Sequence, residues 1–176
     1  MATAAADDVG SGSADTIAAS CEMVRVGVFF DGTNNFRNRG SDAKRAWHSN
    51  PDLLEEIYDE KNCTQVMAEV EGVQRLVHFR KEYMRGIGVK QDGEFSWFGP
   101  GVGTGIEGVD ARVNQAVDWV RSNIRSQMSG KRPCDICIDT FGFLRGATAA
   151  RDFANQINAT IKRYNLGPIS TTVPSR

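Results

Sequence analysis

The sequence lacks the features that mark several classes of protein. No apolar run among its 176 residues approaches the ~20 residues that a helix needs to span a bilayer. Its 21 basic and 22 acidic residues leave a net charge of −1, so bulk charge indicates neither nucleic acid nor an anionic membrane as a partner. We therefore expect a chain made in soluble form in the cytoplasm, with no transmembrane segment and no nucleic-acid partner.

Cysteine is also scarce, at four residues, of which Cys134 and Cys137 form a C-x-x-C. That motif admits half a zinc site or a redox pair, or else two apolar positions of a buried strand. Residues three apart in a strand point to opposite faces, which is poor geometry for chelation. No second C-x-x-C or H-x-H cluster supports a metal. We therefore expect no metal, no cofactor and cysteines that stay reduced during folding.

The two ends of the chain differ in composition from its middle. Residues 1–22 are rich in Ala, Ser, Gly and Asp, which predicts a disordered tail. They carry neither the basic segment nor the apolar core of a Sec signal, so any export would need a dedicated machine. We place one domain at 23–166 and expect residues 167–176 to be frayed.

Strands and helices are predicted to alternate through that domain. Apolar, β-branched runs predict strands at 23–30, 76–85 and 134–140, and helical periodicity predicts helices at 50–58, 110–128 and 145–164. Residues 63–76 are expected to be helical or irregular, and 36–50 and 86–108 to be loops. This order is typical of an α/β fold with a mainly parallel sheet. Because only about three strands are visible, we expect part of a larger domain.

The most specific motif joins the last predicted strand to the last helix. Gly142 and Gly146 flank a central residue at −2 and +2, which is the spacing of a nucleophile elbow, G-x-S-x-G. The central residue of such a turn has a strained backbone, and larger flanking side chains would clash with the strand and the helix. Leu144 stands where the serine would be, and it has no nucleophilic atom. The N–H of Arg145 would point at a developing oxyanion. The alternative is an ordinary packing loop.

A second motif, Asp31-Gly32-Thr33-Asn34, follows the first predicted strand. Haloacid-dehalogenase phosphatases would need an aspartate two places earlier, where this chain has Phe29, so that interpretation fails. Beside an elbow, the backbone N–H groups of Gly32 and Thr33 could supply the other half of an oxyanion hole. The alternative is a turn held by an Asx hydrogen bond from Asp31.

A third motif is the glycine-rich segment 99–108. No G-K-[ST] follows it, so it is not a P-loop, and its G-x-G-x-G is only weakly similar to a dinucleotide fingerprint. The residues before it make a poor strand. We interpret it as a loop near the active-site face.

Taken together and in order, segments 25–35, 83–105 and 139–151 resemble the Tle1-like α/β-hydrolase family of type VI secretion phospholipase effectors. The combination of F-D-G-T-x-N with G-F-x-R-G-A carries the resemblance, which covers about residues 24–164. It implies a partial α/β-hydrolase-like, three-layer fold. It also implies a Ser-Asp-His hydrolase that acts on phospholipid esters and is exported by a type VI machine.

The sequence departs from that family at the site itself. The nucleophile position is Leu144, and the family's acid and histidine follow the nucleophile in chain order. After position 144 the chain has no histidine, and Asp152 is its only acidic residue. Loss of the nucleophile alone can cost on the order of a million-fold in turnover. We therefore expect a domain truncated after its elbow helix and catalytically inactive.

Two other hypotheses remain open. The chain is half of a split hydrolase, completed by a partner chain that adds strands, acid and histidine. Alternatively, it is a non-catalytic module that binds a lipid or a secretion-system component. Its contacts would then be the glycine-rich segment and a basic loop whose members are Arg37, Arg39, Lys44 and Arg45. A solvated surface loop is the simpler interpretation of that basic cluster.

Overall fold

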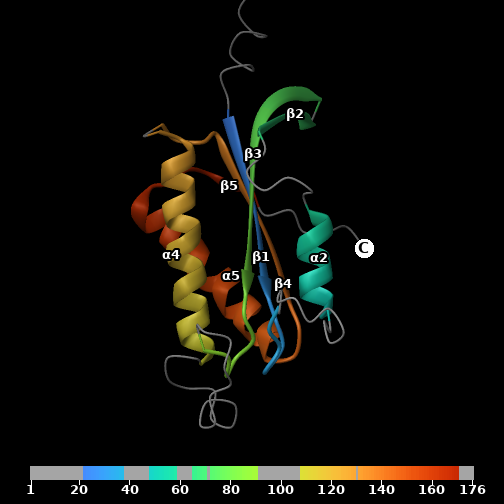
Figure 1. Cartoon of the computed structure of the whole chain (residues 1–176). Coiled ribbons are helices and arrows are strands. Elements are labelled where there is room, and N and C mark those ends of the chain that lie inside the picture. The colour runs from blue at the N-terminus through green and yellow to red at the C-terminus, as the bar shows by residue number, and fades with distance from the viewer. Residues whose placement is uncertain are drawn as a thin grey trace, which may run out of the picture.

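The computed structural model describes residues 22–37, 48–58, 65–70, 72–90, 108–129 and 131–170. Within these residues a five-stranded sheet has three helices packed on it (Figure 1). The strands are β1 (Glu22–Phe30), β2 (Gln65–Val70), β3 (Val73–Met84), β4 (Asp135–Gly142) and β5 (Ile169–Ser170). The helices are α2 (Asn50–Tyr58), α4 (Val109–Gln127) and α5 (Arg145–Tyr164).

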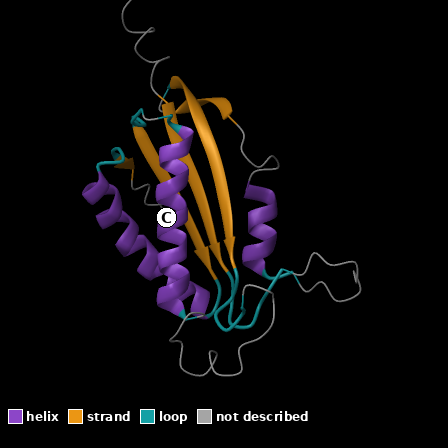
Figure 2. Cartoon of the chain, turned by 60° about the vertical axis from the view of Figure 1, so that its left-hand side comes forward, coloured by secondary structure: helices purple, strands orange, loops and turns teal. Residues whose placement is uncertain are grey.

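The sheet is mainly parallel, as predicted, with the order β2-β3-β1-β4-β5. The central strand β1 pairs in parallel with β3 and β4, and β5 extends the parallel set beside β4. Only β2 is antiparallel, to β3. Helices α4 and α5 lie on one face and α2 lies on the other, so the described residues form three layers (Figure 2). The predicted α/β class is therefore confirmed.

Strand β1 is buried on both faces, which explains its almost unbroken apolar sequence. Alternate residues point to one face, where they pack with the apolar stripes of α4 and α5. These alternate core residues are Val24, Val26, Val28 and Phe30. On the other face Phe29 stacks on Phe141, with 4.9 Å between ring centroids, and meets the ring of Tyr58 on α2 edge-on at 5.3 Å. These ring contacts hold α2 against this face of the sheet.

The prediction for residues 63–76 was wrong, because residues 65–70 form strand β2. Their helix-forming residues are overridden by antiparallel pairing with β3, from Gln65 opposite His78 to Val70 opposite Val73. Gly72, in the connection, has a φ of +77°, which suits the reversal of a tight hairpin.

Helix α5 has the predicted bounds, and it ends at Asn165, whose left-handed backbone has a φ of +50°. The residues that follow it differ from the prediction. Ile169 and Ser170, expected to be frayed, pair with Ile136 and Cys137 as β5. The sheet therefore has five strands where about three were expected.

The prediction that the cysteines stay reduced was wrong for Cys134. Cys134 is disulfide-bonded, whereas Cys137 is not in a disulfide, so the C-x-x-C is not a redox pair. No described helix is long and apolar enough to cross a membrane. Predictions for the N-terminal tail, for Arg39, Lys44 and Arg45, and for residues 91–107 of the glycine-rich loop lie outside the described residues.

Candidate functional site

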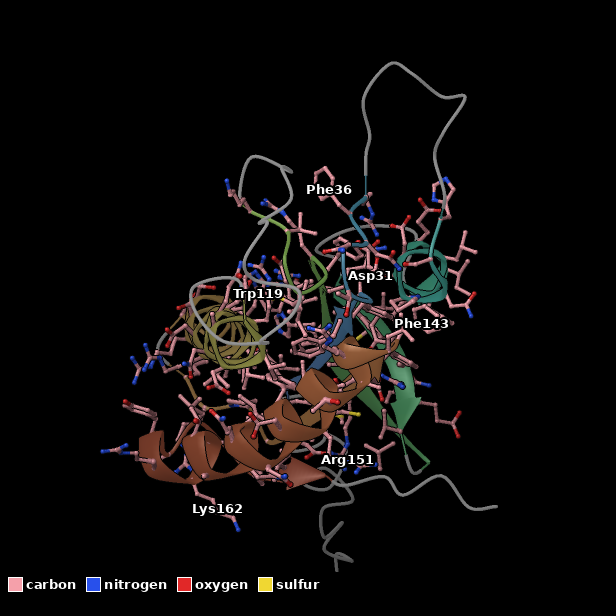
Figure 3. All side chains as sticks on the ribbon, turned by 90° about the horizontal axis from the view of Figure 1, so that it is seen from below. Asp31, Phe36, Trp119, Phe143, Arg151 and Lys162 are labelled. Atoms are coloured by element: carbon pink, nitrogen blue, oxygen red, sulfur yellow. The ribbon has the colours of Figure 1, made fainter. Side chains whose placement is uncertain are left out.

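The two main motifs meet at one edge of the sheet, where β1 and β4 end. From β1 the chain proceeds to β3 on one side, and from β4 it proceeds to β5 on the other. In open α/β sheets, ligands bind at the carboxyl ends of strands where the connections diverge in this way. Figure 3 looks onto this edge and shows Asp31, after β1, near Phe143, after β4.

The turn between β4 and α5 has a strained central residue. Leu144, which lies between Gly142 at the end of β4 and Arg145 at the start of α5, has φ +52° and ψ −124°. A leucine rarely adopts a positive φ, so the backbone is strained at this position. The side chain of Leu144 is 61% exposed and that of Phe143 is 41% exposed. The tip therefore presents two apolar side chains where a nucleophile would stand.

The two flanking glycines are required by close backbone packing. A Cβ on Gly142 would lie 2.3 Å from the carbonyl oxygen of Gly146. A Cβ on Gly146 would lie 2.4 Å from the carbonyl oxygens of both Phe30 and Asp31. The N–H of Phe143 also donates to the carbonyl of Phe30, at 3.1 Å. The glycine spacing thus has a steric cause, the docking of the elbow against the end of β1.

The Asp31-Gly32-Thr33-Asn34 loop lies directly beside the elbow tip. A Cβ on Gly32 would lie 2.8 Å from Cδ1 of Phe143 and 3.3 Å from Cδ1 of Leu144. However, the N–H of Gly32 donates to Oδ1 of Asp31 at 2.6 Å, so in this arrangement it is already used. This bond joins Asp31 to the next residue and not to the residue two places on, so it is not the Asx turn that the alternative described. An oxyanion role for Thr33 and Arg145 stays a prediction.

The rest of this loop is fixed by backbone hydrogen bonds. The N–H of Asn35 closes the turn on the carbonyl of Gly32 at 2.9 Å, and Asn34 has a φ of +60°. The N–H of Asn34 donates to the carbonyl of Ile87 at 3.0 Å. The loop is thereby tied to the segment that follows β3.

Asp31 is the centre of a buried polar network that the motifs did not reveal. Its side chain is buried, and its carboxylate accepts four hydrogen bonds. Oδ1 binds Gly32 N and Asn35 Nδ2, while Oδ2 binds Ser49 Oγ at 2.7 Å and the hydroxyl of Tyr83. A buried carboxylate with this many donors is well satisfied and rigid. It joins β1, the start of α2 and the end of β3.

A second network begins at the amino end of α2. Ser49 caps the helix, because its Oγ accepts the N–H of Asp52 at 3.3 Å. The buried carboxylate of Asp52 in turn pairs with Nε of Arg37 and, at 2.7 Å, with Nδ1 of His48. Arg37 also pairs with Glu55. The start of α2 is therefore held to the loop after β1 by ion pairs.

Arg37 is not part of a solvated basic cluster. Its guanidinium lies 4.5 Å from the ring centroid of Tyr83, and its side chain is only 11% exposed. Burial alone would lower the pKa of Arg37, but its hydrogen bonds to Glu55 and Asp52 raise that pKa above the ordinary value. The solvated-loop interpretation is wrong for this residue, which is a fixed charge of the network.

The two histidines lie at different places. His78 is buried in β3 opposite Val24, near the start of β1, and its Nε2 lies 2.7 Å from a carboxylate oxygen of Glu22. His48 precedes Ser49, which binds Asp31, so it lies on the elbow side of the sheet. Its side chain is 44% exposed. His48 precedes the predicted elbow in the chain, so sequence order gives it no role there, and only the fold places it near the motifs.

Alkaline pH tests the bond between Tyr83 and Asp31. Burial and the hydrogen bond to Asp31 raise the pKa of Tyr83 above its ordinary value of about 10. The unfolded chain releases this proton from about pH 10, while the folded chain keeps it. The stabilisation is thus complete below pH 10 and is lost as pH rises further.

We expect urea unfolding of Tyr83→Phe to show a shallower loss of stability between pH 9.5 and 11.5 than the unmodified chain. The pKa of Tyr58 is raised in the same direction by burial and by its bond to Asp139, so Tyr58→Phe with Tyr83→Phe should be flatter still. Equal slopes in the single variant and the unmodified chain would contradict the assignment.

Comparisons with known proteins add one structural likeness. No family model matches the chain, and no curated protein matches it. Among solved structures, the chain is similar to one described as the Tle1 effector bound to the VgrG spike from the Type 6 secretion system. The two share 23% identity and a TM-score of 0.43, over 87% of this chain and 36% of that one. This chain thus spans about a third of that chain's length.

Proposed function

We propose that this chain is the scaffold of an α/β-hydrolase-type esterase domain that has no catalytic activity of its own. The observation that carries the proposal is Leu144, at the strained tip between β4 and α5, with a φ of +52°. Its flanking glycines and its place beside the end of β1 suit the geometry that elsewhere presents a nucleophilic serine. Leucine offers neither a nucleophilic atom nor a proton to transfer.

A general base is the second requirement of this chemistry, and both histidines of the described residues are bonded to other carboxylates. In this class a histidine oriented by an acid takes the proton of the nucleophile. His78 lies in the middle of β3 opposite Val24, whereas the elbow lies beyond the ends of β1 and β4 at Phe30 and Gly142. His48 is on the elbow side, but its Nδ1 is bonded to Asp52 within the network of α2.

The resemblance of the two motifs to a known family supports a more specific proposal. We propose a relative of the Tle1-like phospholipase effectors, whose substrates would be phospholipid esters and whose partner would be a secretion-system component. The motifs that support this are F-D-G-T-x-N after β1 and G-F-[S→L]-R-G-A between β4 and α5.

An esterase assay tests the proposed inactivity. We expect the purified chain to hydrolyse p-nitrophenyl butyrate and a fluorogenic phospholipid no faster than buffer, and a fluorophosphonate probe to leave it unlabelled. Leu144→Ser should also stay inactive, because the two described histidines are bonded to Asp52 and Glu22 and a serine without a base is a weak nucleophile. Leu144→Ala is the matched control. Hydrolysis by the unmodified chain that the fluorophosphonate abolishes would overturn the proposal.

A second candidate function is a subunit of a split hydrolase. Large apolar side chains exposed on α2 favour it, since such patches often mark interfaces; they are Leu53, Leu54 and Ile57. Leu53, Leu54 and Ile57 border a surface hollow of about 400 Å³. Co-expression with the product of the adjacent reading frame tests this. A stable complex in which Leu144→Ser restores ester hydrolysis would support it, and a complex that stays inactive would contradict it.

A further inference from the structure

Three side chains that can bind a metal ion converge at α2, and two of them are exposed while the third is buried. His48, Asp52 and Glu56 follow one another at intervals of four residues, which places them on one face of the helix and its lead-in turn. Their ligand atoms all lie within 4.8 Å of one another. The start of α2 lies near the end of β1, because Ser49 donates to Asp31 at 2.7 Å, and Figure 3 shows Asp31 next to this helix.

One of the three ligands is anchored and the other two are adjustable. Asp52 is 2% exposed, and Arg37 binds its Oδ1, which fixes the carboxylate and leaves Oδ2 facing His48. His48 and Glu56 are exposed, so their side chains can rotate to shorten the distances around an ion. Water has access to the remaining coordination positions. This combination of a rigid carboxylate with two mobile ligands suits capture of an ion from solution.

The local charge also leaves room for a cation. Arg37 is shared between Asp52 and Glu55, and the Nζ of Lys81 lies 4.0 Å from Glu55 and donates to its carbonyl. Among the residues that the structure describes, no lysine or arginine forms an ion pair with Glu56. Of the carboxylates on α2, Asp52 and Glu55 therefore have cationic partners, whereas Glu56 is one of the proposed ligands and has none among the described residues.

We propose that His48, Asp52 and Glu56 bind one divalent transition-metal ion, with water completing its coordination. One imidazole nitrogen with two carboxylate oxygens suits Zn²⁺ or Mn²⁺, whereas Ca²⁺ and Mg²⁺ prefer oxygen ligands alone. The ion takes the place of the proton between His48 Nδ1 and Asp52 Oδ2. This proposal does not depend on the hydrolase assignment.

Binding would have a consequence for the candidate site. Ser49 lies between His48 and α2, caps that helix through Asp52, and donates to Asp31. An ion held by His48 and Asp52 would therefore fix the residues on either side of Ser49, and with them its hydrogen bonds to Asp31 and Asp52. We expect it to stabilise the loop after β1 against local opening, so that the ion acts as a structural clamp.

Isothermal titration of the purified chain with ZnCl₂, and separately with MnCl₂, tests the proposal. We expect one ion per chain, and binding at least about tenfold weaker in His48→Ala and in Glu56→Gln. Both substituted side chains are exposed, so the fold should persist, which circular dichroism would check. Glu69→Gln, an exposed carboxylate on β2, is the matched control and should bind as the unmodified chain does.

Two further measurements separate this site from other sources of zinc affinity. Cys137→Ser should leave the affinity unchanged, because Cys137 lies on β4. Hydrogen exchange of residues 31–35 and 49–53 should slow when the ion is bound. The proposal is overturned if neither ion binds at 100 µM, if His48→Ala binds as tightly as the unmodified chain, or if Cys137→Ser alone abolishes zinc binding.

Discussion

Replacing Gly146 by alanine is expected to destabilise the fold by about 3 kcal/mol or more, at the upper end of what overpacking costs. The new Cβ would lie 2.4 Å from the carbonyl oxygens of Phe30 and Asp31. Both are backbone atoms, so no side-chain rotation relieves the contact. The start of α5 would have to move away from the end of β1, which disrupts the elbow and the packing of Phe153 behind it, since Phe153 contacts Phe30.

The matched control for this variant is Gly72→Ala. Nothing lies within 4 Å of a Cβ at Gly72, but its φ is +77°, so alanine there suffers backbone strain without a clash. That strain should cost about 1 kcal/mol. Urea unfolding followed by circular dichroism gives both values. If Gly146→Ala proves no more destabilising than Gly72→Ala, the elbow is not packed against β1 as described.

Replacing Asp31 by alanine is the second change with a large expected effect, again about 3 kcal/mol or more. The carboxylate is buried and accepts four hydrogen bonds, so its removal leaves several donors without an acceptor. Hydrogen bonds to charged groups contribute about 1.5–3 kcal/mol each, and an unsatisfied buried donor adds its own desolvation cost. The effect should appear as a lower urea midpoint with little change in the slope.

Variants of its partners show how the stabilisation by Asp31 is distributed. Tyr83→Phe removes one donor and should cost roughly 1.5 kcal/mol. Ser49→Ala removes a donor to Asp31 and also the cap of α2, so it should cost more, roughly 2.5 kcal/mol. A double-mutant cycle of Asp31→Ala with Tyr83→Phe should give a coupling energy above about 0.5 kcal/mol, because the two groups touch. Asp118→Ala, 66% exposed on α4, is the control and should change stability by less than about 0.5 kcal/mol. A coupling energy near zero would argue against the network.

Elements with a strong local pattern could be predicted well. The helix expected at 145–164 has the bounds of α5, and the strand expected at 23–30 differs from β1 by one residue. Helix α5 buries one face, so its apolar residues recur at helical spacing. Strand β1 is buried on both faces, so its sequence is an almost unbroken apolar run. A tight turn between Gly142 and Gly146 could be predicted for a related reason. A Cβ at either glycine would clash with backbone atoms, so the two glycines mark the close packing in the sequence.

Elements that depend on distant partners could not be predicted. Strand β2 carries helix-forming residues and exists because β3 pairs with it. Strand β5 is two residues long, too short to show a pattern. Asp31 bonds to Ser49 and Tyr83, which are 18 and 52 residues away, and a turn motif contains no information about such partners.

The sequence by itself determined that position 144 holds no nucleophile, because that is a matter of side-chain chemistry and not of folding. It also determined where the tight turn between β4 and α5 forms, because the spacing of Gly142 and Gly146 reflects local sterics. Only the tertiary structure decided that the N–H of Gly32 donates to the carboxylate of Asp31. It also decided that His48 lies within hydrogen-bond distance of Asp52 beside the motifs. Those outcomes depend on which donors and acceptors the packing of α2, β1 and β3 brings within hydrogen-bond distance, and that distance is set by the folded chain.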